Sequence, residues 1–217
     1  MMIDTTRQSG LLSQEVLDQQ TVELIGCGAI GSHAAEALTK VGIRKLSLWD
    51  YDLVESHNLS NQGYYLPDLG KPKVEALAER LREGTGAEII CQNRKYEGQR
   101  LKGGIVVSAV DNMSTRYEIF DKFKESRAKL FIDARMAARF GQVFCVTQAP
   151  DSLARYEGTL FSDEEAYQEP CTEKSTIFCA YGLASLISAQ LFNYLKEGEA
   201  AHQVEVCFRN MTMYQVK

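Results

Sequence analysis

The sequence has six cysteines among its 217 residues, but no two of them form a C-x-x-C pair. Pairs at that spacing are the usual ligands of a structural zinc ion, so no structural zinc is expected. The scattered cysteines do not suggest a disulfide framework either, which favours a reducing compartment and a cytoplasmic location. They are Cys27, Cys91, Cys145, Cys171, Cys179 and Cys207.

Positive charge is in the minority, with 24 lysines and arginines against 29 aspartates and glutamates and a net charge of -5. Proteins that bind nucleic acids or membrane surfaces through general electrostatics carry a basic excess. We therefore expect no nucleic-acid partner and no membrane partner. The first ten residues also lack the apolar core of a signal peptide, so no export signal is predicted.

Long apolar runs are absent except at residues 175–195, which carry no charged residue over about the length that a bilayer requires. This stretch includes serine, glutamine and asparagine, and its large apolar residues follow helical spacing. A buried helix with a face of small residues is the favoured interpretation. The small residues are Ala180, Ala184 and Ala189.

Strand and helix patterns alternate through the first two thirds of the chain. This alternation is typical of an α/β fold with a Rossmann-like, doubly wound and mostly parallel sheet. The expected strands are Val22–Ile25, Leu46–Trp49, Ile105–Val110 and Leu130–Asp133, and the expected helices are Ile30–Lys40, Lys73–Arg82 and Ser114–Glu125.

The pattern changes after residue 141. Residues 142–147 are expected to form a strand with no helix after it, and residues 150–174 a long polar loop of a length that is usually functional or mobile. Residues 204–208 and 211–216 predict a C-terminal antiparallel strand pair. We interpret residues 1–217 as one domain, with a nucleotide-binding half, 1–148, and a second half, 149–217, of crossover loop, long helix and final strands.

A glycine-rich segment, Gly26-Cys27-Gly28-Ala29-Ile30-Gly31, joins the first expected strand to the first expected helix. In a G-x-G-x-x-G loop the backbone amides and the helix N-terminus can face a phosphate. Alone the pattern is weak, because glycines also serve ordinary tight turns. Asp50 follows the second strand, where a carboxylate takes the ribose hydroxyls in dinucleotide-binding folds.

The polar residues that follow Asp50 disfavour an NAD-dependent oxidoreductase. An oxidoreductase needs contacts to ribose and nicotinamide, whereas this set suits a triphosphate. Lys73 would neutralise phosphate charge during attack at phosphorus, and Asp111, at the end of a strand, would hold Mg²⁺. The other members of the set are Asp52, Asn58, Asn61, Gln62 and Lys71.

Together these motifs resemble those of the ThiF/MoeB/HesA adenylyltransferases, bacterial relatives of ubiquitin-activating enzymes. The family pattern is G-x-G-x-x-G, D-x-D, N-L-x-R-Q, G-x-P-K and a strand that ends in D-N. Upstream, Arg7-Gln8 resembles the family's R-Q pair. The matching segments are Gly26 to Gly31, Asp50-Tyr51-Asp52, Asn58-Leu59-Ser60-Asn61-Gln62, Gly70-Lys71-Pro72-Lys73 and Asp111-Asn112.

The resemblance implies that a carboxylate attacks the α-phosphorus of ATP and gives an acyl adenylate and pyrophosphate. The carboxylate is typically the C-terminal glycine of a ubiquitin-like protein, a sulfur carrier or a peptide. Such a step needs positioning and charge neutralisation rather than proton transfer. The resemblance further implies a homodimer in which Arg7 reaches the triphosphate of the partner subunit. The implied nucleotide contacts are Gly26, Gly28, Ala29, Ile30, Gly31, Asp50, Asp52, Asn58, Gln62, Lys73, Asp111 and Asn112.

One position departs from the family pattern, because the arginine of N-L-x-R-Q is Asn61 here. Another cation would have to replace it, with Lys71 and Arg135 as candidates. The alternative is a chain that does not catalyse adenylation and instead serves as a nucleotide-binding partner subunit.

Cys171 lies at the end of the long loop and just before a helix, whose dipole would favour a thiolate. In the family, such a cysteine takes the activated acyl group or forms a persulfide. An inert cysteine is the alternative, and Cys179 is expected in the core. The long loop is expected to lie over the substrate tail. We expect His33 and His57 to be polar residues with satisfied hydrogen bonds rather than metal ligands, because no metal-ligand spacing accompanies them, and the basic residues of 116–129 to face solvent.

Overall fold

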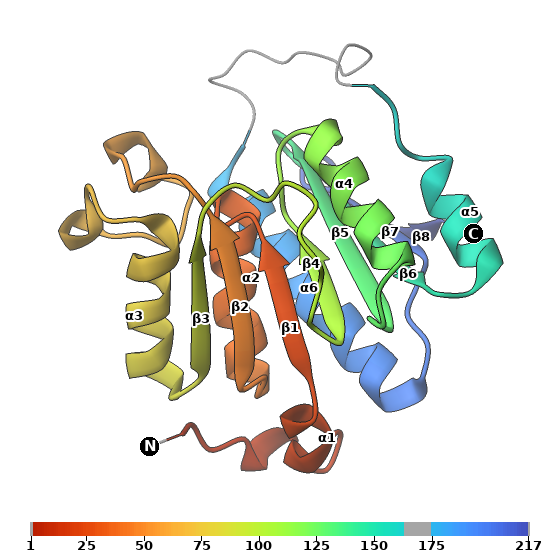
Figure 1. Cartoon of the computed structure of the whole chain (residues 1–217), viewed down its shortest axis with the longest axis horizontal. Helices are drawn as coiled ribbons and strands as arrows, with labels where there is room; N and C mark the ends of the chain where they lie inside the picture. Colours follow the sequence, from red (N-terminus) through yellow and green to blue (C-terminus); the bar gives the residue numbers. More distant parts are fainter. Residues whose placement is uncertain (1, 163–174, 217) are drawn as a thin grey trace.

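A computed structural model describes residues 2–162 and 175–216. Eight strands form one sheet in the order β3-β2-β1-β4-β5-β6-β7-β8 (Figure 1). The first five strands in the chain are parallel and the last three continue the sheet antiparallel. The strands are β1 (Thr21–Ile25), β2 (Lys45–Asp50), β3 (Glu88–Asn93), β4 (Ile105–Ser108), β5 (Leu130–Ala137), β6 (Phe140–Thr147), β7 (Gln203–Cys207) and β8 (Thr212–Val216).

Helices cover both faces of this sheet. One apolar cluster joins α2, α3 and α6 to one face, and a second, rich in aromatic residues, joins α4 and α5 to the other (Figure 1). The order of strands reverses between β1 and β4, so the carboxyl ends of these two strands flank a topological switch point. The helices are α1 (Gln14–Asp18), α2 (Ala29–Val41), α3 (Lys73–Thr85), α4 (Met113–Lys124), α5 (Pro150–Glu157) and α6 (Ile177–Glu197), with short 3-10 turns η1 (Thr6–Gln8), η2 (Ser56–Asn58) and η3 (Leu66–Asp68).

The predicted α/β class, the mostly parallel sheet and the C-terminal antiparallel pair are confirmed. The pattern missed β3, an edge strand whose Ile90 is 61% exposed, because it shows neither a buried apolar run nor a clean alternation. Residues 94–104, all of which the structure describes, then cross from β3 to β4 without a helix. Tyr96 and Leu101 from this connection are buried against the sheet.

Two expectations about residues 130–174 were wrong. A helix, α5, does follow β6, and it occupies the first eight residues of the expected long loop. Pro150 stands in its first turn, where the missing N–H costs nothing, and Tyr156 is fully buried in the aromatic cluster. The strand at residues 130–133 is also longer, because β5 continues to Ala137 before its hairpin with β6.

Within the described part of the chain, α6 is the one helix long and apolar enough to cross a membrane by length and composition. One face of it packs on α2 and on β5 and β6, which confirms a helix partly buried in the fold. Ala180 and Ala184 are on the buried face, but Ala189 is exposed. Nine residues at 100° each carry Ala189 half a turn away from Ala180, so the predicted small-residue face includes only the first two alanines.

Candidate active site

The glycine-rich loop connects β1 to α2, and two of its three glycines, Gly26 and Gly31, meet a steric demand. Gly26 has φ +92° and lies so close to Ala109 that a Cβ atom would be 2.6 Å from its carbonyl oxygen. A Cβ atom on Gly31 would be 1.8 Å from the carbonyl oxygen of Gly26, so only glycine lets α2 begin this close to the loop. At Gly28, the N-cap of α2, a Cβ atom would point into open space. The loop backbone is therefore open at Gly28, beside amides that have no acceptor within the helix.

Two distant side chains hold this loop at Cys27. The Asp50 carboxylate, at the end of β2, accepts from the Cys27 N–H at 2.7 Å and from the Asp52 N–H at 2.9 Å. The Tyr64 hydroxyl donates to the Cys27 carbonyl oxygen at 2.7 Å. Burial raises the pKa of Asp50 above its ordinary value, although both N–H donors favour the charged form. Sequence reasoning missed Tyr64, whose contact spans 37 residues and leaves no local pattern.

Asp52 and Lys73 form an ion pair at the start of α3. The Lys73 Nζ atom lies 2.8 Å from Asp52 Oδ2, and the Lys73 N–H donates to the Asp52 carbonyl oxygen at 2.9 Å. The Lys73 side chain is 7% exposed, whereas that of Asp52 is 47% exposed. The D-x-D and G-x-P-K motifs therefore meet through this pair, which keeps a buried ammonium group beside the end of β2.

Asp111 and Asn112 lie between β4 and α4. Asp111 is exposed, and its Oδ1 atom accepts from the Asn112 side chain at 3.2 Å. Asn112 is the N-cap of α4, because its side-chain oxygen accepts from the Thr115 N–H at 2.8 Å. The same connection touches the glycine-rich loop at Ala109, whose N–H donates to the Ile25 carbonyl oxygen. Asp111 therefore follows β4, which is the neighbour of β1 in the sheet, and the glycine-rich loop follows β1.

Mg²⁺ is normally held by one or two carboxylates together with water and substrate phosphates. Among the described residues, no group of three histidines, cysteines or carboxylates could hold a metal ion by protein ligands alone. One exposed carboxylate near the glycine-rich loop, as Asp111 provides, would suit an ion held jointly with substrate phosphates.

The N-L-S-N-Q segment begins at Asn58, the last residue of η2, and continues as a tight turn to Gln62. Asn58 is 5% exposed, and its side chain accepts from the Glu55 N–H at 2.9 Å, so it caps the turn. Asn61, at the position of the family arginine, donates to the Ser175 hydroxyl. The side-chain oxygens of Asn61 and Gln62 are buried and have no hydrogen-bond partner among the described residues.

His33 in α2 lies beside this segment and differs from its expectation. Its ring is 4.4 Å from that of Tyr181, and its Nε2 atom is buried without a partner in the described part of the chain. Burial lowers the pKa of His33, so the ring is neutral at neutral pH. It is therefore a buried histidine with an unsatisfied nitrogen, rather than the satisfied one expected. His57 is exposed and lies 3.3 Å from Glu55.

The two cations proposed to replace the arginine at Asn61 are already paired in this structure. Lys71 Nζ lies 2.9 Å from Glu79. Arg135 lies 2.8 Å from Asp133 and donates to the Thr159 carbonyl oxygen at 2.9 Å. Lys71 or Arg135 would therefore have to leave its present partners to take the place of the family arginine.

Arg116 corrects the expectation that the basic residues of 116–129 face solvent. It is 4% exposed and its Nε donates to Asp133 at 2.7 Å. The signal was present in the spacing, because Arg116 lies three, four and seven residues before Ile119, Phe120 and Phe123, which are all buried. The apolar stripe of α4 therefore includes one charged residue.

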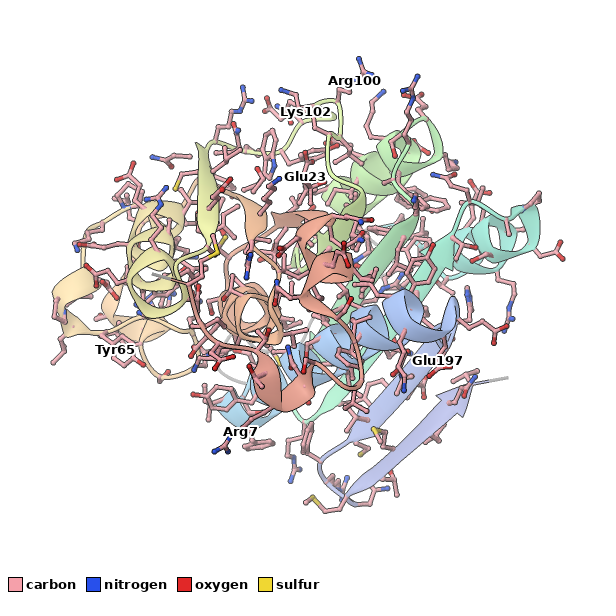
Figure 2. The ribbon with its side chains drawn as sticks, turned by 90° about the horizontal axis from the view of Figure 1, so that it is seen from below. Arg7, Glu23, Tyr65, Arg100, Lys102 and Glu197 are labelled. Atoms are coloured by element: carbon pink, nitrogen blue, oxygen red, sulfur yellow. The ribbon has the colours of Figure 1, made fainter. Side chains whose placement is uncertain are left out.

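Arg7 lies far from the loop in its own chain. Its neighbour Gln8 donates to the carbonyl oxygen of Val41, the last residue of α2. Because α2 has 13 residues and rises about 1.5 Å per residue, Arg7 is about 20 Å from Gly28. Figure 2, seen from the side of the N-terminal segment, shows its side chain pointing outward.

Cys171 lies outside the described residues, so its predicted role stays a prediction. Cys179 is fully buried in α6, as expected, and burial raises the pKa of its thiol to about 11. The described part of the expected substrate-covering loop consists of α5 and a short extension to residue 162.

The sequence model of a protein family, described as "ThiF family", matches residues 3–214. The chain belongs to the ThiF family. Its sequence is 43% identical over 133 residues to ubiquitin-like modifier-activating enzyme 5 of Aedes aegypti, covering 52% of this chain and 33% of that protein. It is 32% identical over 117 residues to tRNA threonylcarbamoyladenosine dehydratase 2 of Saccharomyces cerevisiae, covering 49% and 26%. The ThiF chain thus overlaps about a third or less of these curated relatives.

Solved structures show the same fold. Escherichia coli MccB with AMPCPP and the peptide MccA superposes with a TM-score of 0.75 at 15% identity, covering 94% of this ThiF chain and 65% of that chain. PaaA superposes with a TM-score of 0.75 at 18% identity, covering 99% of this chain and 69% of the PaaA chain. At these identities the likeness shows the fold alone.

Proposed function

We propose that this ThiF-family chain is an ATP-dependent adenylyltransferase that activates the C-terminal carboxylate of a small ubiquitin-like protein, sulfur carrier or peptide. The observation that carries the proposal is the meeting of three motifs at one edge of the sheet. The glycine-rich loop, the Asp52–Lys73 pair and Asp111 follow β1, β2 and β4, three neighbouring strands. Family membership and the ATP and AMPCPP named with MccB structures support the same chemistry.

The residues act through position and charge. A carboxylate and a triphosphate are both negative, so the attack needs donors and cations at the phosphates. The loop amides around Gly28 provide donors, and Lys73 provides a buried cation already close to β2. Asp50 would take the ribose hydroxyls with its remaining lone pairs.

Asp111 is the residue proposed to hold Mg²⁺. When bound with the phosphates, the ion would supply positive charge beside Asp111. The bond between the α- and β-phosphates breaks, and pyrophosphate leaves with its negative charge. The acyl adenylate that remains is the activated form of the carboxylate.

ATP–pyrophosphate exchange tests this function. The carriers are small proteins and peptides that end in glycine, and the matched controls are the same carriers with an amidated C-terminus, which removes the attacking carboxylate. We expect exchange only with a free carboxylate. The Lys73→Gln variant should lose about 100-fold or more of this activity, because one charge-stabilising donor is removed from the transition state. ATP binding without exchange for every carrier would contradict the proposal.

Asn61 favours one second candidate, a partner subunit that binds ATP without adenylating. Its side chain bonds Ser175 where the family pattern has an arginine. Asn61→Arg separates the two candidates. If the chain is an active enzyme, the change alters exchange only modestly. If it is a partner subunit, the wild type binds ATP, shows no exchange, and gains it with the arginine.

We also propose that Cys171 receives the activated acyl group. The test is capture of a thiol-sensitive thioester after reaction with carrier and ATP, with Cys171→Ala as the variant and Cys179→Ala as the matched control. A thioester that persists in Cys171→Ala removes this role.

A further inference from the structure

One buried carboxylate, Asp133, holds two arginines and a tyrosine beneath the β4–α4 connection. Its Oδ1 atom accepts from Arg116 at 2.7 Å, and its Oδ2 atom accepts from Arg135 at 2.8 Å and from the Tyr156 hydroxyl at 3.0 Å. Asp133 is fully buried. Burial alone would raise the pKa of Asp133, but the two guanidinium groups outweigh it and hold the pKa below its ordinary value.

Arg116 also contacts the backbone on both sides of Asp111. Its Nη2 atom donates to the Val110 carbonyl oxygen at 2.6 Å, and its Nη1 atom contacts the Asn112 carbonyl oxygen at 3.4 Å. These two carbonyls belong to the residues immediately before and after Asp111. A planar guanidinium can donate to two carbonyls and a carboxylate from three separate nitrogens in fixed directions, whereas a lysine has all its donors on one nitrogen.

The connection is fixed from the other side by its contact with the glycine-rich loop. Ala109, two residues before Asp111, bonds the end of β1 and lies against Gly26. Asp111 itself is exposed, and its only described side-chain contact is with Asn112. The direction of its carboxylate therefore depends on its backbone, and Arg116 fixes that backbone.

We propose that Arg116 and Asp133 are positioning residues for Asp111. Asp133 orients the Arg116 guanidinium, and Arg116 holds the Asp111 backbone so that the carboxylate faces an ion bound with the phosphates at the glycine-rich loop. Neither residue touches the nucleotide. The inference rests on the ATP site of the proposed function, but not on the identity of the carboxylate that is activated.

The test measures the dissociation constant of ATP with and without Mg²⁺, by calorimetry on the full chain. In the wild type, Mg²⁺ should tighten ATP binding. Arg116→Lys keeps a cation for Asp133 but loses the two carbonyl contacts. It should reduce the tightening of ATP binding by Mg²⁺ about 10-fold, because losing a group that orients a metal ligand commonly weakens metal affinity by at least that factor. Its metal-free ATP affinity should stay that of the wild type.

Tyr156→Phe is the matched control. It removes a donor from the same carboxylate, and Tyr156 forms no hydrogen bond with residues 110–112 among those described, so the tightening by Mg²⁺ should be unchanged. A double-mutant cycle adds a second readout: in an Asp111→Asn background, Arg116→Lys should have no further effect on the tightening, because it acts through Asp111.

Melting temperatures are measured first. If Arg116→Lys does not fold, Arg116→Gln takes its place in the same titrations, because it removes the guanidinium while Asp133 keeps its ion pair with Arg135. An unchanged tightening in the folded variant, or an equal loss of affinity with and without Mg²⁺, would overturn the inference. Mg²⁺-dependent binding without pyrophosphate exchange would leave it standing and overturn only the proposed adenylation.

Discussion

At the scale of single residues, buried charges mark where this ThiF chain departs from an ordinary core. Glu23, in the middle of β1, is 5% exposed; its Oε1 atom accepts from the Lys102 and Gly103 N–H groups at 2.8 and 3.2 Å (Figure 2). Its Oε2 atom is buried with no partner among the described residues. Burial raises the pKa of Glu23 above its ordinary value of 4.5. The carboxylate fixes the helix-free β3–β4 connection, but its charge is poorly accommodated.

Glu23→Gln should therefore stabilise the protein at neutral pH, since the amide oxygen keeps both N–H donors and the charge is removed. A raised folded-state pKa means that the protonated form is favoured by folding. That contribution is present below the unfolded pKa and is lost as pH rises through the folded pKa. We expect a gain of about 1 kcal/mol in unfolding free energy near pH 8, the order of the cost of one unpaired buried polar group. Denaturant unfolding at several pH values measures it, and a gain that is as large near pH 4 would contradict the explanation.

At the scale of elements, the glycines between β1 and α2 have two different roles that the sequence pattern does not distinguish. Gly31 is required by packing, whereas Gly28 leaves the loop backbone open. Gly31→Ala should destabilise the fold by several kcal/mol, because the new Cβ atom would overlap the Gly26 carbonyl oxygen. Gly28→Ala places its Cβ atom in open space, so the melting temperature should change little while ATP affinity falls. Thermal melting and ATP titration of this matched pair check both. Equal destabilisation by the two changes would mean that Gly28 is also a packing glycine.

Sequence patterns predicted the elements with strong periodicity and the loop with a steric requirement. They did not predict β3 or α5, because Ile90 is exposed on an edge strand and α5 has only eight residues. In the site, local motifs supplied Asp50, Lys73 and Asp111. Tyr64 and the Arg116–Asp133 pair were missed because their partners lie 17 to 37 residues away in the chain.

At the scale of the whole molecule, the N-terminal segment and the glycine-rich loop lie at opposite ends of α2. Arg7 cannot reach its own loop, so its predicted role requires a second copy of the chain. The homodimer stays a prediction, and mixing two defective chains tests it.

Arg7→Ala and Asp111→Ala should each abolish exchange alone. Mixed and allowed to exchange subunits, they should recover about a quarter of the wild-type activity, because half of the dimers are mixed and each mixed dimer has one complete site. Light scattering on the same samples confirms the assembly state. Mixtures that stay inactive although mixed dimers form would remove Arg7 from the partner's site.

The two contacts that hold Cys27 have a thermodynamic consequence. Asp50 fixes its N–H and Tyr64 its carbonyl, so the glycine-rich loop already has one conformation before any nucleotide arrives. A preorganised loop loses little conformational entropy on binding. Phosphate recognition by this loop should therefore proceed in a single kinetic step whose rate follows nucleotide concentration, without a slower ordering phase.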